Sequence, residues 1–518
     1  MIYNLWKRCT LIGSLAILEA LAANISTPET FVGGTPPVST LQCDALLAAG
    51  LGDRVLSPTD FGYEKQVQTW WARNAQLHPW CIVLPESTEE VSLTLTTLLK
   101  AGNGAGDWHI AVRSGGHGFQ LNNNIQNGVT IDLSMLNYSR YYAETNTAML
   151  GSGGRWENVY ASLGDQGVVV VGGRDGDVGV GGFLLGGGTS YFSPKYGFAC
   201  DSVLNYEVVL TNGSVVNANK TSNPELWKAL KGGGSNFGIV TRFDLEALPA
   251  RDIHYEVRIL PATASDVVSD TLIKFADHDM SLADNALVTF LQYNGTAGPD
   301  ITITAIYVNT AGHNGVKTAF DNIRDIPSIR NVSVQQSVAK TAAGSKVQGG
   351  QLSAAATLLF KNDPEILQYS TKLHEDFVKS LQSSIGPEAF GTMIFLQPVG
   401  MDHGNIAEQR GGNMLGLERL KSNAIMWTGG VYVLTNDADF AVAEACLTSM
   451  SDKIQRFAKS VGGDMDLVYL NYASPRQDAL AGYGPQNVEF IREVAAKYDP
   501  SGAFQTRVPG GFKIGRSG

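Results

Sequence analysis

The sequence of 518 residues predicts an α+β protein in two parts, and three patterns along the chain support this. After a loop-rich segment at residues 24–75, a regular pattern of a strand, a helix and two further strands extends from residue 78 to residue 134. Short apolar runs separated by glycines follow, up to Pro249. Beyond Pro249, alternating strands and amphipathic helices are typical of an antiparallel sheet with covering helices. We therefore expect the following organisation: 24–249 (core 76–249), 250–460, and a C-terminal segment, 461–518.

The first part opens with a β-α-β pattern. A short apolar strand, "WCIVLP", precedes "STEEVSLTLTTLLKAG", which has a Ser-x-x-Glu capping box and helical spacing. The runs "WHIAVRS" and "GVTIDLS" are the next strands, so this segment is of α/β type. Further along, "TNGS" between two apolar runs predicts a hairpin with a primed turn.

The second part contains helices and strands but no motif that identifies a ligand. The expected helices are "ASDVVSDTLIKFADHDM", "GVKTAFDNIRDI", "DPEILQYSTKLHEDFVKSLQSS" and "ADFAVAEACLTSMSDKIQRFAKSV". The expected strands are "NALVTFLQYN", "DITITAIYVN", "GTMIFLQPVG" and "AIMWTGGVYVLTN".

Composition excludes several classes of function. The net charge of −11 comes without a block of basic residues, which argues against nucleic acid or an anionic membrane as a partner. The chain has no C-x-x-C motif, and "HEDFV" at His374 lacks the second histidine of a zinc helix, so we expect no metal site. We expect a monomer.

The N-terminus has the pattern of a signal peptide at residues 1–23. Lys7 and Arg8 precede "CTLIGSLAIL", and Ala20 and Ala22 form a small-x-small cleavage site. The run is too short to span a membrane; the alternative is an N-terminal core helix. Six N-x-S/T sequons also favour a secreted glycoprotein: Asn24, Asn137, Asn212, Asn219, Asn294 and Asn331.

Removal of the signal peptide would leave four of the five cysteines. Cys43 and Cys81 flank the start of the first strand-rich region of an apparently exported chain, and we expect them to form the only disulfide. Cys200 and Cys446 lie in apolar surroundings and are expected to be buried thiols.

Three glycine-rich loops lie next to strands, at residues 114–118, 179–188 and 232–238. Glycine allows a backbone to approach a ligand closely and to present N–H groups to anionic oxygens. A single such loop would more simply be a tight turn, but three in one domain favour an extended ligand with a pyrophosphate. His117 is the one imidazole in these loops, and its neighbours Gly115, Gly116 and Gly118 have no side chains.

Five segments together carry a specific resemblance: "HPWCIVLPESTEEV", "VRSGGHG", "VGVGGFLLGGGTSYFSPKYGFACDSV", "KGGGSNFGIVT" and "YLNYASPRQDALAGYG…KYDPSGAF". They resemble the berberine-bridge-enzyme-like family of FAD-linked oxidases, which has the vanillyl-alcohol-oxidase-type flavin fold. The similarity extends from about residue 76 to about residue 513 and is greatest to fungal members. It implies a two-part FAD-binding domain, a substrate-binding domain, and a C-terminal segment that returns to the FAD domain.

The resemblance also implies how FAD is held. The histidine that matches His117 is bonded to the flavin 8α-methyl carbon in this family, and the flanking glycines would admit the ring. The other cofactor-binding positions carried over are Arg113, Ser114, Gly115, Gly116, Gly118, Val178, Gly179, Gly181, Gly182, Gly186, Gly187, Gly238, Ile239, Val240 and Asn471.

Two positions of the flavin loop distinguish this chain within the family. Many members carry a second flavin link from a cysteine where this chain has Asp175, so the resemblance implies attachment through His117 only. Single attachment weakens the interpretation as a carbohydrate oxidase, because double attachment accompanies open oligosaccharide sites in the family. Val178 occupies the position that guards the approach of oxygen to the flavin, and a valine there is typical of oxidases.

Catalysis would need a base that takes the substrate proton while a hydride leaves to the flavin. Tyr472 and Tyr469, on either side of Asn471 in "YLNY", are the candidates. The alternative is that they pack the junction between the domains, which is an equal possibility for Tyr472 and the preferred one for Tyr469. The strand "AIMWTGGVYVL" lacks the glutamate base of some relatives, and Trp427 and Tyr432 are expected to be pocket walls.

These expectations amount to a secreted FAD-dependent oxidase. Its substrate would be a small organic molecule, such as a secondary-metabolite alcohol, a polyketide or an alkaloid, and O₂ would be reduced to hydrogen peroxide. The alternatives are an oligosaccharide oxidase that forms lactones and a flavin-scaffold cyclase without net redox chemistry.

Overall fold

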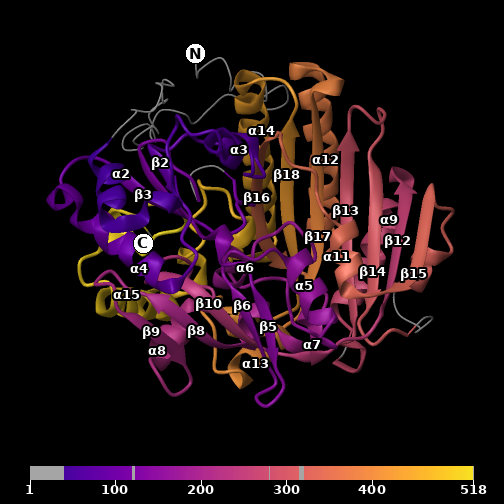
Figure 1. The fold of residues 1–518 in the computed structure, drawn as a ribbon. Helices are drawn as coiled ribbons and strands as arrows, with labels where there is room; N and C mark the ends of the chain where they lie inside the picture. Colours follow the sequence, from indigo (N-terminus) through magenta and orange to yellow (C-terminus); the bar gives the residue numbers. More distant parts are fainter. Residues whose placement is uncertain (1–39, 120–122, 279, 314–319, 517–518) are drawn as a thin grey trace.

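A computed structural model describes residues 40–119, 123–278, 280–313 and 320–516. The expected signal peptide at residues 1–23 and the sequon at Asn24 lie outside the described residues. Three main sheets and their helices form the molecule, with the large sheet at the right of Figure 1 and the two smaller ones at the left and below.

The first sheet is the predicted β-α-β unit. Its order is β1 (Val55–Leu56), β2 (Cys81–Val83), β4 (Gly128–Asp132), β3 (His109–Arg113), and β2, β4 and β3 run parallel. Helix α4 (Thr88–Lys100) follows β2, and the Ser87 side chain accepts a hydrogen bond from the Glu90 N–H, as the capping box predicts. The Glu90 carboxylate accepts from the Glu86 N–H at 2.7 Å instead of from Ser87.

The second sheet is antiparallel and has five strands. Their order is β5 (Ser139–Tyr142), β6 (Thr147–Gly151), β10 (Ile239–Glu246), β8 (Val203–Val209) and β9 (Val215–Asn219). The predicted hairpin joins β8 to β9, but the prediction of a primed turn is wrong. Only Gly213 has a positive φ, 83°, and its N–H donates to the Leu210 carbonyl at 2.9 Å. This is the three-residue loop that ends in a left-handed glycine, which needs no positive φ at Asn212.

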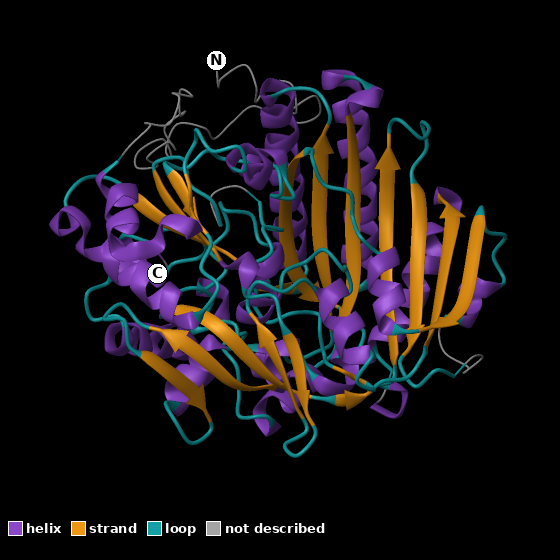
Figure 2. Cartoon of the chain, viewed as in Figure 1, coloured by secondary structure: helices purple, strands orange, loops and turns teal. Residues whose placement is uncertain are grey.

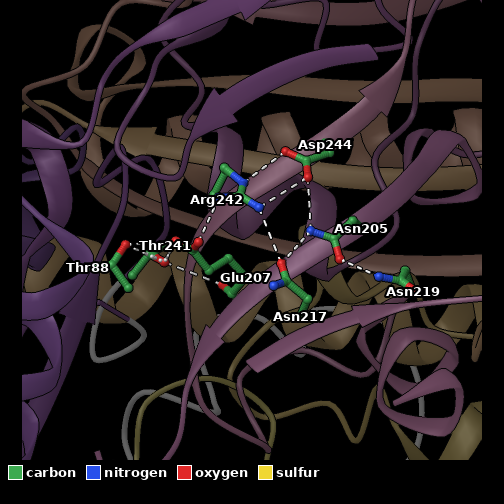
Figure 3. A network of polar contacts seen from close by, with 8 residues as sticks. All are labelled: Thr88, Asn205, Glu207, Asn217, Asn219, Thr241, Arg242 and Asp244. Atoms are coloured by element: carbon green, nitrogen blue, oxygen red, sulfur yellow. Dashed lines mark hydrogen bonds and ion pairs between the residues drawn. The ribbon is translucent and has the colours of Figure 1, made fainter. Parts of the chain in front are cut away.

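A polar network ties the second sheet to helix α4 (Figure 3). Arg242 donates to Glu207 at 2.7 Å and to Asp244 at 3.0 Å. The Thr88 hydroxyl, at the start of α4, donates to the same Glu207 at 2.8 Å. The carboxylates accept hydrogen bonds from the guanidinium and from the Thr88 hydroxyl, so the network fixes the position of α4 relative to the strands.

The third sheet is the antiparallel sheet that the second half of the sequence predicts (Figure 2). Its eight strands run in the order β15 (Arg330–Gln336), β12 (Ile253–Pro261), β14 (Thr302–Asn309), β13 (Asn285–Asn294), β17 (Phe390–Val399), β18 (Ala424–Val433), β16 (Leu352–Lys361) and β19 (Asp464–Met465). Three helices pack on one face of it: α9 (Ser265–Ala276), α12 (Pro364–Ile385) and α14 (Asp437–Ser460). The opposite face is left to line a cavity.

Shorter elements complete the chain. The two-stranded sheet pairs β7 (Val168–Val169) with β11 (Leu248–Pro249). The remaining helices are α2 (Leu41–Leu46), α3 (Tyr63–Val67), α5 (Trp156–Gly164), α6 (Val180–Leu185), α7 (Ser193–Tyr196), α8 (Pro224–Leu230), α10 (Asp321–Arg324), α11 (Val338–Gly344), α13 (Asp402–Gln409), α15 (Pro485–Tyr498) and α16 (Ala503–Thr506). Within the described ranges, no helix combines the length and the hydropathy that crossing a bilayer requires.

The C-terminal residues lie beside the first sheet, where Figure 1 marks the end of the chain. Phe504 and Val508 belong to the apolar core under that sheet, and the Ile110 N–H donates to the Arg507 carbonyl at 2.8 Å. The chain therefore leaves the large sheet after β19 and packs again against its own beginning.

The cysteines follow the prediction in part. Cys43 and Cys81 form a disulfide, and Cys200 is free and buried, both as expected. Cys446, on α14, is also disulfide-bonded, so the expectation that it is a free thiol and that the chain has one disulfide is wrong. Its apolar helix predicts its burial, with 5% of its surface exposed, but burial does not determine the redox state of a thiol.

Candidate active site

A cavity of about 1010 Å³ lies between the glycine-rich loops and the open face of the large sheet. It is within the size range of cofactor and ligand sites and large enough for an extended molecule. One wall comes from the loop after β3, from the loop before α6 and from α6 itself. A second comes from the C-terminal residues, and a third from strands of the large sheet.

The glycines form a cradle because the loops touch through their backbones. A Cβ atom at Gly115 would lie 2.5 Å from the Gly179 Cα, and one at Gly179 would lie 2.3 Å from the Gly115 nitrogen. Any side chain at either position would separate the two loops. Gly182, on the cavity side, has no atom within 4 Å of its would-be Cβ, so its backbone faces open space. A flat ring system and a pyrophosphate fit such a wall.

His117 projects into this cavity with an unsatisfied ring nitrogen. Its Nε2 is buried and has no hydrogen-bond partner among the described residues. The indole of Trp71 stacks on the imidazole with 4.7 Å between ring centroids. The glycine neighbours therefore do not leave His117 without packing, because Trp71 supplies one face from far away in the sequence. Burial lowers the pKa of His117, which keeps the imidazole neutral and nucleophilic.

Asp175 lies at the same end of the cavity. One of its carboxylate oxygens is 3.8 Å from His117 Nε2, beyond hydrogen-bond distance. The carboxylate is held by two backbone N–H groups, from Asp177 at 2.7 Å and from Val347 at 2.9 Å. The position at which many resembled proteins have a cysteine is thus next to His117 and is occupied by an oriented carboxylate.

The structure brings most of the predicted site residues to this cavity. The predicted residues that line it are Ser114, Gly115, Gly116, His117, Gly118, Val178, Gly179, Gly181, Gly182, Gly186, Gly238, Ile239, Val240, Tyr469, Asn471 and Tyr472. Arg113 and Gly187 are not part of the lining. Arg113 instead forms a buried ion pair with Asp132 at 2.7 Å under the first sheet's edge, and Gly187 packs against Leu415 and Tyr469.

Of the two aromatic residues of β18 that were expected to line the pocket, only one does so. Tyr432 lines the cavity. Trp427 is fully buried in the core between the large sheet and its helices, so the expectation for Trp427 is wrong. Side chains alternate between the two faces of a strand. Trp427 therefore points to the helices, and Tyr432, five residues later, points to the cavity.

The two candidate tyrosines differ in their contacts. The Tyr469 hydroxyl accepts hydrogen bonds from the Gly188 N–H at 2.9 Å and the Asn471 amide at 3.1 Å. Burial raises the pKa of Tyr469, so it stays a neutral group that packs the junction. The Tyr472 hydroxyl lies 2.9 Å from Arg174 and 3.2 Å from Thr189, which makes it the one of the two that contacts a cation.

Apart from Tyr432, the wall from the large sheet was not predicted from the sequence. It presents aromatic, hydroxyl and amide side chains: Tyr255, Phe290, Gln292, Ser353, Thr392, Phe395, Thr428 and Tyr432. None of these carries a charge. The charged or titratable lining residues outside the tyrosines, namely His117, Arg174, Asp175 and Lys346, all lie outside the strands of this sheet. A neutral molecule with aromatic surface and hydroxyl groups fits this wall.

Comparison with known proteins places the cavity in context. Residues 79–219 match the family described as the FAD binding domain. The chain is 33% identical over 514 residues to the FAD-dependent monooxygenase drtC of Aspergillus calidoustus, covering 99% of this chain and 97% of that protein. It is 35% identical over 482 residues to the FAD-dependent monooxygenase sdcF of Emericella nidulans, covering 92% and 98%.

Solved structures share the fold at lower identity. Glucooligosaccharide oxidase from Acremonium strictum, with a 6-S-cysteinyl, 8α-N1-histidyl FAD, matches with a TM-score of 0.70 at 18% identity, covering 91% of this chain and 100% of that one. A variant of berberine bridge enzyme in complex with (S)-reticuline also matches with a TM-score of 0.70 at 18% identity, covering 91% and 99%.

The glycine cradle, the cavity and these matches define an FAD-dependent oxidoreductase. The chain belongs to the same family as the fungal FAD-dependent monooxygenases named above, and it shares the fold of berberine bridge enzyme. The resemblance inferred from the sequence motifs and the two-part fold that it implied are both confirmed.

Proposed function

We propose that this protein is a secreted oxidase that transfers a hydride from a small, neutral, hydroxylated organic molecule to FAD attached covalently through His117 alone. When bound, FAD accepts the hydride and passes two electrons to O₂, which becomes hydrogen peroxide. The observation that carries the proposal is the neutral, unpartnered imidazole of His117 in a glycine cradle, beside Asp175 where a cysteine would be needed for a second link.

The residues of this chain have separate roles in the proposed reaction. The glycine loops would hold FAD, and Trp71 fixes the plane of the His117 imidazole. Tyr472 takes the proton of a substrate hydroxyl group. The carbon that carries this hydroxyl gives up a hydride, and a carbonyl group forms. Thr392 and Gln292 on the large sheet are placed to orient hydroxyl groups of the substrate, while Phe395 supplies apolar surface.

Secretion and glycosylation belong to the same proposal. The Cys43–Cys81 disulfide is the kind of bond that persists in an oxidising compartment. Four of the sequon asparagines, Asn137, Asn212, Asn294 and Asn331, are exposed and accessible to a glycosyltransferase. Asn219 is less available because its amide donates to Asn205 at 3.0 Å.

A second candidate is monooxygenation, because the two relatives described above are named monooxygenases. In that case one oxygen atom of O₂ would enter the product and the other would leave as water, with two electrons drawn from the substrate or from an added reductant.

One experiment separates these functions. The purified enzyme is mixed anaerobically with panels of neutral phenolic or polyketide alcohols and of oligosaccharides, and bleaching of the flavin is recorded. Air containing ¹⁸O₂ is then admitted. The oxidase proposal predicts bleaching by a member of the first panel, one hydrogen peroxide per product and no label in the product. Incorporation of ¹⁸O into the product would establish a monooxygenase. Bleaching of the flavin by sugars alone would establish an oligosaccharide oxidase. Formation of product without bleaching would establish a cyclase.

A further inference from the structure

Tyr432 lies across the neighbouring strand of the large sheet. It is paired with Gly391 of β17, and a Cβ atom at Gly391 would lie 2.2 Å from both the Cζ and the hydroxyl oxygen of Tyr432. The phenol end of Tyr432 therefore occupies the space above Gly391 that a side chain would fill. Val431 and Val433 pack on the helix side of β18, so this ring lies on the cavity side.

Gln292 lies one strand further along the sheet, on β13, which borders β17 (Figure 1). Its neighbours Leu291 and Tyr293 pack on the helix side, and Gln292 itself lines the cavity. The Thr304 hydroxyl, on β14, donates to the Gln292 Oε1 at 2.8 Å. This hydrogen bond fixes the amide, so its Nε2 is left to face the cavity.

The Tyr432 hydroxyl and the Gln292 amide are close enough to contact one ligand group. Gly391 is paired with Asn294, so Gln292, two residues earlier, is the diagonal neighbour of Gly391. Diagonal neighbours in a sheet lie about 7–8 Å apart, a distance that long side chains bridge. Neither the Tyr432 hydroxyl nor the Gln292 Nε2 has a hydrogen-bond partner among the described residues.

Both groups are uncharged donors. Burial raises the pKa of Tyr432, so the phenol keeps its proton, and an amide nitrogen can only donate. No charged side chain reaches the cavity from the described strands of this sheet, and Lys346, at the cavity edge, is paired with Glu157 at 2.7 Å. The pair therefore fits an uncharged acceptor, such as a carbonyl or ether oxygen. A ligand without this oxygen would leave the two donors unsatisfied.

The cavity floor is low between these donors and the end of the sheet nearest Tyr472. Gly430 is paired with Met393, and a Cβ atom at Gly430 would meet no atom closer than 3.4 Å. Phe395, two residues beyond Met393, stacks toward Tyr472 with 6.3 Å between ring centroids. Because Met393 is the partner of Gln292, the amide lies about 7 Å along the sheet from Phe395. A flat ring system fits over this floor.

We propose that Tyr432 and Gln292 determine substrate specificity by donating hydrogen bonds to a carbonyl or ether oxygen at the end of the substrate remote from the hydroxyl that is oxidised. The inference deepens the proposed function and rests on it only for which end of the substrate reacts. The substrate is then a flat, neutral molecule with an acceptor oxygen roughly 7 Å or more from its reacting hydroxyl. Gly391 and Thr304 are positioning residues, because they fix the Tyr432 ring and the Gln292 amide.

Anaerobic equilibrium dialysis of the oxidised, flavin-containing enzyme tests this with two probes of the same bicyclic shape. 6-Hydroxy-1-tetralone has a carbonyl across the ring from its hydroxyl, and 5,6,7,8-tetrahydro-2-naphthol lacks that carbonyl. Wild type should bind the ketone about tenfold more tightly. Tyr432→Phe and Gln292→Leu should each reduce this ratio to about threefold, and the double variant should abolish it. Tyr142→Phe, at an exposed position of β5, should keep the wild-type ratio.

Three further variants test the positioning residues and leave both donors in the chain. Gly391→Ala places a methyl group where the Tyr432 ring lies, so it should lower the ratio as Tyr432→Phe does. Thr304→Val releases the Gln292 amide and should lower the ratio as Gln292→Leu does. Thr304→Ser keeps the hydroxyl and should keep the ratio.

Three results would overturn the inference: equal binding of the two probes by wild type, binding of neither probe at its solubility limit, or a ketone preference that persists in the double variant. Dialysis needs no turnover, so its outcome is separate from that of the proposed function. A preference for the ketone that the double variant loses, in an enzyme that oxidises no alcohol, would contradict the proposed oxidation and support the donor pair.

Discussion

The His117 imidazole and the Asp175 carboxylate lie 3.8 Å apart at one end of the cavity, on two loops that meet through Gly115 and Gly179. The burial that keeps His117 neutral prevents this contact from becoming an ion pair. Two backbone N–H groups hold the carboxylate. We therefore expect one covalent flavin link at this end of the cavity, through His117.

The proximity makes Asp175→Cys a gain-of-function variant. A thiol at this position would reach the same edge of the flavin as His117, so we expect a second link to form. Mass spectrometry of a protease digest should then find the peptides containing residues 117 and 175 joined through one flavin. Asp175→Ser is the matched control and should stay singly linked. A cysteine variant with flavin on the His117 peptide alone would show that the two positions do not share one ring edge.

Val178 lines the cavity between the two touching loops, and its size should control the access of oxygen. Val178→Ile adds one methylene in a space suited to a diatomic molecule. We expect stopped-flow measurement to show slower reoxidation of the reduced enzyme by O₂, by about tenfold or more, with the rate of flavin reduction by substrate nearly unchanged. Val215→Ile, on the exposed edge strand β9, is the control. Equal slowing of both half-reactions would mean that Val178 only fills space.

The buried His374 should make the large sheet sensitive to acid. Burial lowers its pKa to about 3, and its Nε2 is 2.7 Å from the hydroxyl of Thr392, which lines the cavity. In the unfolded chain a histidine has a pKa near 6.5, so below that pH the unfolded state binds a proton that the folded state does not bind. Stability is therefore complete above about pH 6.5 and falls with decreasing pH, by about 2 kcal/mol at pH 5.

Urea unfolding of His374→Met at pH 7 and pH 5 tests this. The variant loses the bond to Thr392 and is less stable at both values, but the difference between them should shrink by about 2 kcal/mol relative to wild type. His313→Leu, at an exposed position, should keep the wild-type difference. An unchanged difference in His374→Met would assign the acid sensitivity to other groups.

The Cys43–Cys81 disulfide closes a loop with a sequence separation of 38 and pins α2 to β2. By the chain-entropy relation a loop of this length stabilises the fold by up to about 4 kcal/mol. We expect Cys43→Ser to lower the midpoint of thermal unfolding of the FAD-binding half. The double variant Cys43→Ala/Cys81→Ala should not lower it further by a comparable step, because each change breaks the same bond. Additive losses would show that the cysteines act separately.

The sequence was informative where the backbone itself is constrained. Gly115 and Gly179 must lack side chains for the loops to touch, so the motif around His117 is readable without the fold. The residues that complete the site are readable only in three dimensions. Trp71 reaches His117 and Arg174 reaches Tyr472 by tertiary contact, and no local pattern links either pair.

The same limit explains the strands that sequence patterns missed. Strand β16, "LSAAATLLFK", is buried on both faces along nearly all its length, so it lacks the alternation that identifies a strand, and its alanines favour a helix. Strand β15 lies at the edge of the large sheet and is mostly exposed, so it has no continuous apolar face. Trp427 was misplaced because the face that it occupies depends on which side of β18 the helices cover.

The most direct test of the account is the location of the flavin. The enzyme is precipitated with acid, washed and digested, and the flavin-bearing peptide is sequenced by mass spectrometry, with His117→Ala and the surface variant His313→Ala treated in parallel. The account predicts that wild type and His313→Ala keep a yellow pellet with one flavin on the peptide containing His117, and that His117→Ala releases its flavin into the supernatant. Flavin on a cysteine-containing peptide, or flavin retained by His117→Ala, would contradict it.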